Sequence, residues 1–136
     1  MIVVDASALA KYVLKEEGWR DVRKLLEGGA VSVDHVVKEV SNAIWRKCAV
    51  LKLEDAGVAV KRYELLVELV RSGVVVLESE LKYLEKAFRI AIENGVTVYD
   101  SLYIAQAREL GARLLTSDRK QAEVATRLGV SPVYVP

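Results

Sequence analysis

The sequence predicts an α/β fold with three layers (α/β/α), in which helices cover both faces of a central, mainly parallel sheet of roughly five strands. Short apolar runs without polar alternation, such as residues 1–4 and 74–77, are typical of strands buried on both faces. The segments between such runs carry apolar residues at helical spacing, so strands alternate with helices. No repeat, low-complexity tract or linker interrupts the 136 residues. We therefore expect one domain over residues 1–136.

The first half of the chain supplies two strands and four helices. A strand at residues 1–4 runs into Asp5, and paired glycines at 28 and 29 end a short helix before the second strand. Asp34 and Asp55 precede helical patterns and can cap them. The expected elements after the first strand are helices at 6–15 and 19–26, a strand at 30–33, and helices from 34 to about 50 and from 53 to about 71.

The second half repeats the alternation. Ser79 can cap one helix, and Gly111 lies where the next one ends. Pro132 opens the last strand and favours an edge position, because proline lacks an N–H for a neighbouring strand. The expected elements are strands at 74–77, 113–116 and 132–135, and helices at 80–93, 99–110 and 120–128.

Composition excludes several classes of protein. A hydrophobic content of 52% and a charged content of 29% are typical of globular chains rather than disordered ones. The net charge of +1 predicts no global basic field, so nucleic-acid contacts would need local patches. No apolar run is long enough to span a membrane, and no signal peptide is evident. Cys48 stands alone, which excludes an internal disulfide and favours a buried thiol in a cytoplasmic protein.

Four acids occupy comparable places in this scheme. Asp5 follows the first strand and Asp118 follows the strand at 113–116, while Glu39 and Asp100 lie in the first turns of helices. In a parallel sheet these positions meet at the carboxyl edge, where open α/β folds bind their ligands. Each acid could instead be a helix cap, and we prefer that interpretation for Asp34 and Asp55.

Clustered carboxylates repel one another and need a counter-charge. Mg²⁺ and Mn²⁺ prefer oxygen ligands, so a divalent ion would resolve the repulsion. Such an ion lowers the pKa of bound water and clamps a phosphodiester, which is nuclease chemistry.

Polar residues near the acids fit a supporting role. Ser7, Thr116 and Ser117 offer hydroxyls beside Asp5 and Asp118, and Asn42 shares a helical face with Glu39. For Ser7 and Ser117, helix capping is the alternative interpretation. His35 lies one turn before Glu39, but no second histidine or cysteine accompanies it, so we do not expect it to bind metal.

In four segments the chain resembles the PIN-domain ribonucleases, and among them the VapC-type toxins of prokaryotic toxin–antitoxin pairs. The segments are residues 3–9 (VVDASAL), 39–43 (EVSNA), 99–107 (YDSLYIAQA) and 115–118 (LTSD). The resemblance implies a Mg²⁺- or Mn²⁺-dependent endoribonuclease that forms homodimers, with Asp5, Glu39, Asp100 and Asp118 as acidic ligands. It also implies supporting roles for Thr116 and Asn42, and a cognate antitoxin that places a basic or polar side chain in the acidic cleft.

The hypothesis is therefore hydrolysis of RNA by a metal-activated water, without a nucleophilic side chain. A housekeeping RNA-processing PIN nuclease and a non-catalytic PIN-like binding module remain alternatives. A haloacid-dehalogenase-like phosphatase is disfavoured because Ser7 stands where a second aspartate is needed, and a dinucleotide-binding fold lacks its glycine-rich turn.

Cationic and apolar surfaces supply candidate contacts with partners. Trp45 and Tyr103 could stack on bases, although packing in the core or a dimer is the more ordinary role. The helix expected after residue 53 is rich enough in Val and Leu to pair with a second copy or an antitoxin. The cationic groups lie after the predicted acids and could contact RNA phosphates: Lys11 and Lys15, Arg46, Lys47 and Lys52, and Arg119 with Lys120.

Overall fold

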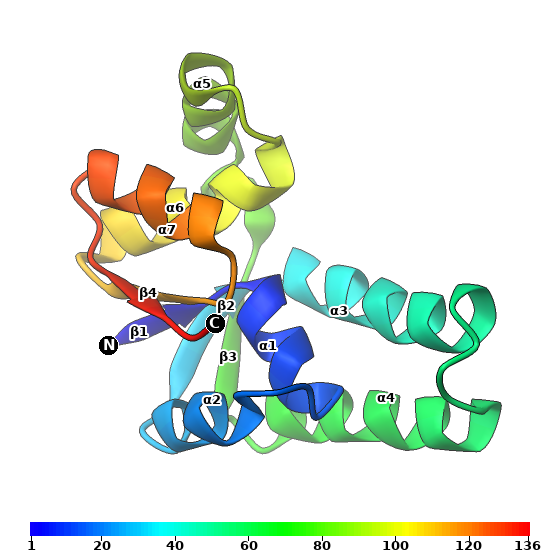
Figure 1. Cartoon of the computed structure of the whole chain (residues 1–136). Coiled ribbons are helices and arrows are strands. Elements are labelled where there is room, and N and C mark those ends of the chain that lie inside the picture. The colour runs from blue at the N-terminus through cyan, green and yellow to red at the C-terminus, as the bar shows by residue number, and fades with distance from the viewer.

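The computed structural model describes all 136 residues, and a five-stranded sheet forms its centre (Figure 1). All neighbouring strands are parallel, and their order across the sheet is β3-β2-β1-β4-β5. The strands are β1 (Ile2–Val4), β2 (Ala30–Val33), β3 (Val75–Glu78), β4 (Arg113–Thr116) and β5 (Pro132–Tyr134). The predicted sheet is thus confirmed, and Pro132 does begin an edge strand.

Helices cover both faces of the sheet, as Figure 1 shows, so the three-layer α/β/α architecture is also confirmed. Parallel connections are right-handed, and the chain moves one way along the sheet before β3 and the other way after it, which sends the two helix groups to opposite faces. The first group is α1 (Ala6–Val13), α2 (Trp19–Leu26), α3 (His35–Trp45) and α4 (Ala56–Arg71). The second is α5 (Leu84–Asn94), α6 (Val98–Leu110) and α7 (Arg119–Arg127). None of these helices has the length and apolar character needed to cross a membrane.

The centre of the core is formed by β1 and α6. Val3 and Val4 are completely buried, as expected for a strand covered on both faces. All residues from 101 to 107 of α6 are buried, so this helix is enclosed nearly all round while it packs on β1, β2 and β4. A rigid central helix therefore carries the acid at its first turn, Asp100.

Register places the ends of β1 and β4 side by side. Val4 pairs with Leu115, and the backbone N–H of Asp5 donates to the carbonyl oxygen of Leu115 at 3.0 Å. Asp5, directly after β1, and Asp118, two residues after β4, therefore leave the same edge of the sheet. The sheet's hydrogen bonding, rather than loop packing, sets this juxtaposition.

The structure corrects several boundaries. The helix expected from 34 to 50 is α3 followed by a π-helical turn, η1 (Arg46–Val50), and α4 begins three residues later than expected. Asp34 does not cap α3: its φ and ψ are −61° and −23°, which are helical values, and its side chain accepts instead from the N–H of Glu80. The helix expected at 80–93 is interrupted, because a 3₁₀ turn, η2 (Glu80–Lys82), precedes α5.

Glu78 anchors this interrupted region. Its carboxylate accepts hydrogen bonds from the hydroxyl of Tyr83 at 2.6 Å, from Nε2 of Gln106 at 3.0 Å and from the Lys82 ammonium. These bonds, led by the one from Lys82, lower the pKa of Glu78 to about 2. One carboxylate thus joins the end of β3 to η2 and to the buried face of α6.

We predict that Glu78→Ala lowers the free energy of unfolding by about 2 kcal/mol, because it leaves the buried Gln106 amide and Tyr83 hydroxyl without their partner. Urea denaturation monitored by circular dichroism measures the change. Glu85→Ala is the matched control, since Glu85 is exposed and pairs only with Arg89, and it should cost less than about 0.5 kcal/mol. Equal losses in the two variants would contradict the anchoring role.

Candidate active site

Asp5 is a buried carboxylate at the junction of β1 and α1. It is the N-cap of α1, and its Oδ1 accepts from the N–H of Ala8 at 3.0 Å and from Oγ of Ser7 at 2.7 Å. Only 3% of the residue is exposed. Burial raises the pKa of Asp5 to about 6, although the hydrogen bonds from Thr116, Ala8 and Ser7 oppose the shift. The bonds from Ser7 and Ala8 both use Oδ1.

A hydroxyl network joins Asp5 to the end of β4. Ser7 Oγ donates to Asp5, and Oγ1 of Thr116 lies 3.2 Å from Ser7 Oγ, within hydrogen-bond distance. Ser7 Oγ also accepts from the N–H of Ser117 at 2.9 Å, and Thr116 Oγ1 accepts from the N–H of Asp118 at 3.1 Å. The network fixes the two acidic loops against each other.

Asp118 repeats the geometry of Asp5 on the neighbouring strand. It is the N-cap of α7, and its Oδ1 accepts from the N–H of Gln121 at 3.1 Å. Unlike Asp5 it is exposed. Capping and a functional role, which the sequence presented as alternatives, are compatible in both aspartates, because the cap occupies only one of the two oxygens.

Asp100 lies in the first turn of α6. The hydroxyl of Thr97, the N-cap of this helix, accepts from the N–H of Asp100 at 3.1 Å, and Nε2 of Gln121 donates to its carbonyl oxygen at 2.8 Å. Burial raises the pKa of Asp100, and the charge of Asp118 adds to the increase, whereas Thr97 and Lys120 oppose it. The carboxylates of Asp100 and Asp118 are therefore close enough to repel each other electrostatically.

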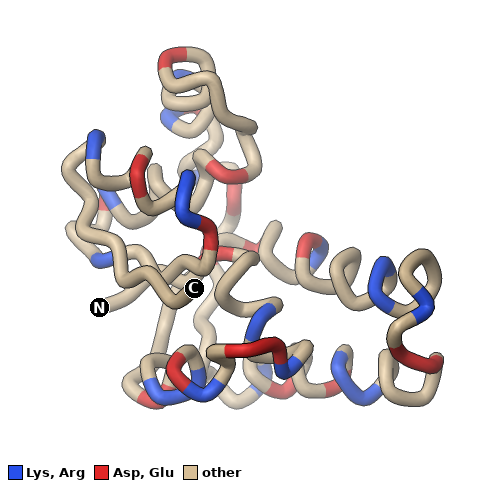
Figure 2. Tube along the Cα trace, viewed as in Figure 1, with Lys and Arg blue, Asp and Glu red and all other residues tan.

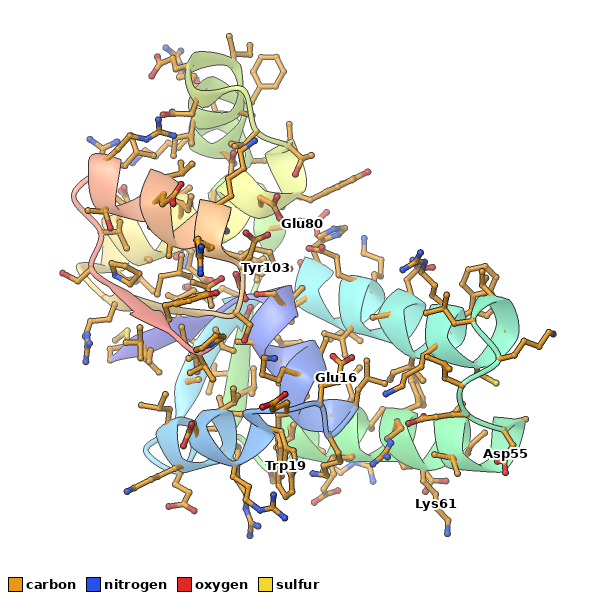
Figure 3. All side chains as sticks on the ribbon, viewed as in Figure 1. Glu16, Trp19, Asp55, Lys61, Glu80 and Tyr103 are labelled. Carbon is orange, nitrogen blue, oxygen red and sulfur yellow. The ribbon has the colours of Figure 1, made fainter.

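Glu39 reaches the same region from α3. The hydroxyl of Tyr103, one turn after Asp100 on α6, donates to Oε1 of Glu39 at 2.6 Å. Burial raises the pKa of Glu39, while the Tyr103 hydrogen bond lowers it. Figure 3 shows Tyr103 close to the first turns of α1 and α3. His35 stands 3.5 Å from Glu39 and stacks on Tyr99, so its imidazole borders the site.

The four predicted acids line one cavity of about 230 Å³. Asp100 and Asp118 also line an adjoining cavity of about 250 Å³ that contains Lys120. Figure 2 shows acidic stretches of the chain converging near the centre of the molecule, close to the starts of α1 and α7. The cavity's other lining residues are Ala6, Ser7, Ala10, Ala43 and Tyr103.

The donor set fits a hard divalent cation in its chemistry, although the side chains are not preassembled as ligands. No three Asp, Glu, His or Cys side chains are already grouped so that they could hold a metal ion. Burial raises the pKa of three of the four carboxylates, and the charge of a neighbouring acid adds a smaller increase in each. Ion binding would therefore require side-chain rotation, and it would remove an electrostatic cost.

The predicted supporting residues differ in whether they contact the acidic loops. Ser7 and Thr116 do contact the acidic loops, but Ser7 and Ser117 do not cap helices, because Asp5 and Asp118 do. Asn42 is exposed and does not line the cavity, so its role beside Glu39 stays a prediction.

Two contributors were missed from the sequence. Thr97 could have been identified from the spacing Thr-x-x-Asp to Asp100, which is typical of a helix start. Tyr103 is 1% exposed, so the preferred prediction of core packing is confirmed and base stacking is wrong, but its hydrogen bond to Glu39 was not predicted.

We predict that Asp5→Asn stabilises the metal-free protein at pH 8. Asp5 ionises near pH 3.8 in the unfolded chain and near pH 6 when folded, so the unfolded state binds fewer protons between these values and wild-type stability falls as pH rises through them. Asparagine keeps the cap without the buried charge. The variant's advantage should be absent near pH 4 and reach roughly 2–3 kcal/mol above pH 6.

Chemical denaturation in EDTA at pH 4, 6 and 8 measures this advantage. An advantage of Asp5→Asn that does not change with pH would show that the buried charge carries no cost.

The fold and cavity define a parallel α/β domain whose carboxyl edge presents an acidic, oxygen-rich site. A family model described as the PIN domain matches residues 2–127, so the chain belongs to the PIN domain family.

Two curated relatives come from Pyrobaculum aerophilum. Ribonuclease VapC3 is 35% identical over 126 residues, which is 90% of this chain and 92% of the relative. Exonuclease VapC9 is 31% identical over 119 residues, which is 87% of this chain and 80% of the relative. The similarity therefore extends across nearly all of the fold.

Two solved structures have the same fold. PAE2754 from Pyrobaculum aerophilum superposes with a TM-score of 0.67 at 24% identity, covering 97% of this chain and 88% of its own. VapC20 of Mycobacterium tuberculosis, described as a sarcin-ricin loop cleaving toxin, superposes with a TM-score of 0.68 at 19% identity, covering 90% of this chain and 94% of its own. At these identities the likeness supports the architecture alone.

Proposed function

We propose that this protein is a divalent-metal-dependent endoribonuclease and the toxin of a toxin–antitoxin pair. The observation that carries the proposal is the convergence of Asp5, Glu39, Asp100 and Asp118, from four separate elements, on one cavity. Membership of the PIN domain family and the ribonuclease name of the VapC3 relative support it. The activity that the names of both VapC relatives share is that of a nuclease, a class of hydrolase.

Asp5, Asp100 and Asp118 would hold Mg²⁺ or Mn²⁺, with Glu39 as a further ligand or as the base that accepts a proton from water. The ion would supply a water of lowered pKa and a positive charge for the phosphodiester. Tyr103 fixes the Glu39 carboxylate, and the hydroxyls of Ser7 and Thr116 fix the two loops. Hydrogen-bonded carboxylates of this kind orient a metal or its water.

A cognate antitoxin is the proposed protein partner. Its basic or polar side chain would enter the cavity and compensate the same carboxylates that a metal does. We place both partners in the cytoplasm, where the RNA substrate is found, and we treat residues 1–136 as one nuclease unit. A cluster of 31 buried residues drawn from both helical layers supports that unit.

A housekeeping RNA-processing nuclease would use the same site. The neighbouring gene distinguishes the two roles, since a short reading frame encoding a DNA-binding start and a disordered end indicates an antitoxin. A non-catalytic binding module is the second alternative, and it would leave the convergence of four carboxylates on one cavity without a catalytic use.

We predict that Asp118→Asn reduces RNA cleavage in Mn²⁺ by at least 100-fold, whereas Asp55→Asn leaves it within twofold. Both aspartates cap a helix through Oδ1, so asparagine preserves the fold in each case. Only Asp118 lines the cavity, and Figure 3 shows Asp55 at the far tip of the arm formed by α3 and α4. Gel assays on linear and circularised RNA of one sequence, with and without EDTA, measure the effect.

The circular substrate separates the proposed endonuclease from an exonuclease, which the name of the VapC9 relative makes a specific alternative. Cleavage of the linear RNA alone would contradict endonucleolysis. A wild-type protein that neither cleaves RNA nor gains thermal stability from Mn²⁺ would favour the binding module.

We also propose a homodimer, supported by an apolar stripe on η2 and α5. Leu84, Phe88 and Ile92 recur at helical spacing on α5, Leu81 on η2 precedes them, and all four are exposed. Exposed apolar residues of this kind are candidates for burial by a second copy.

Phe88→Glu should therefore convert a dimer into a monomer in light scattering coupled to size-exclusion chromatography. Val60→Glu on α4 is the comparison, because Val60 is equally exposed. A monomeric wild type, or dissociation by Val60→Glu alone, would overturn the choice of α5.

A further inference from the structure

A groove of about 390 Å³ adjoins the acidic cavity and plays no part in the metal chemistry described above. The two hollows share Ser7, Ala10 and Ala43 as lining residues, so the groove opens directly beside the carboxylates. It runs between α1 and the arm formed by α3, η1 and the loop before α4, which projects from the sheet in Figure 1.

The groove combines cations with an apolar wall. Leu14, Leu51 and Leu53 form the wall, and the latter two are exposed without a partner in this chain. The charged lining residues are Lys11, Arg46, Lys47 and Glu16, the last of which Figure 3 shows near the end of α1.

Two of these four charged residues have a partner within the chain. Lys47 is 3.5 Å from Glu54, and Nζ of Lys11 donates to the carbonyl oxygen of Glu17 at 3.0 Å. Lys11 and Arg46 make no ion pair, and the side chain of Arg46 makes no hydrogen bond either, so Arg46 is the more available of the two cations for an anionic ligand. The groove thus keeps the Lys11 ammonium and the Arg46 guanidinium without a paired carboxylate, beside an apolar wall.

A buried hydroxyl supplies a further ligand signal. Oγ of Ser117 lines the groove, is shielded from solvent and has no hydrogen-bond partner. A buried polar atom without a partner costs roughly 1–3 kcal/mol, so rotation of this side chain toward a polar group bound in the groove would relieve that cost. Ser117 directly precedes Asp118, which lines the acidic cavity.

The geometry points to a nucleotide subsite: we propose that the groove binds the RNA nucleotide next to the scissile phosphate. Its phosphate would contact Arg46, its base would pack against Leu51 and Leu53, and a sugar or phosphate oxygen would accept from Ser117 Oγ once that side chain turns into the groove. The volume lies within the roughly 300–1,000 Å³ of small-molecule sites and accommodates one nucleotide. The inference rests on the proposed function. It predicts that the apolar wall of the groove sets the preferred nucleotide at one position beside the cleaved phosphodiester.

The test uses Arg46→Glu and Leu51→Ser, both at exposed positions that should tolerate the change. Arg46→Glu should raise KM for a single-stranded RNA about tenfold, leave kcat within about twofold and reduce the salt dependence of kcat/KM by about one counterion. Arg127→Glu at the exposed end of α7 changes the net charge equally and is the control, with KM within twofold. Fluorescence anisotropy in EDTA should show the same order of RNA affinities.

Leu51→Ser should change the nucleotide preference at one position beside the cut, measured by sequencing the products of a randomised RNA pool. The subsite would be overturned if both variants kept the wild-type KM, RNA affinity and cleavage preference. The same result is expected if the groove binds a protein instead of RNA. Absence of RNA cleavage by the wild-type protein would instead count against the proposed function, so the two failures are distinguishable.

Discussion

The parallel pairing of β1 with β4 is the constraint on which the rest of the site depends. These two strands are far apart in the chain, yet their register brings Asp5, Thr116 and Asp118 to one edge. The hydroxyls of Ser7 and Thr116 then lock the two loops together. Glu39 and Asp100 arrive on helices that pack against this frame, and Tyr103 ties one of those helices to the other. Acid placement is therefore a property of the sheet and its covering helices.

Function and stability oppose each other at this edge. Burial raises the pKa of Asp5, Glu39 and Asp100, so ionising these groups near neutral pH works against folding of the metal-free chain. The cost is offset elsewhere, by a continuous core around α6 and by satisfied anchors such as Glu78. An anionic cavity attracts cationic groups, whether they come from a metal ion or from a protein partner.

Much of this could be predicted from the sequence because local patterns and the global fold agree. Apolar runs gave the strands, and acids placed after them predicted the common edge. The features that could not be predicted are those created by tertiary contacts. Asp34 lies where a cap is expected, but it adopts helical backbone angles and bonds to Glu80. The hydrogen bond from Tyr103 to Glu39 joins α3 and α6, and no single-segment pattern encodes that pair.

Asp5 and Asp118 each cap a helix and also line the acidic cavity, and this combination has an evolutionary consequence. Asparagine caps a helix about as well as aspartate, so folding alone does not distinguish the two residues at these positions. An inactive descendant could therefore arise by a single amide replacement and persist as a well-folded protein. Any lineage that keeps both carboxylates does so under selection for their charge, and drift to the amide would mark the point at which that selection ceased.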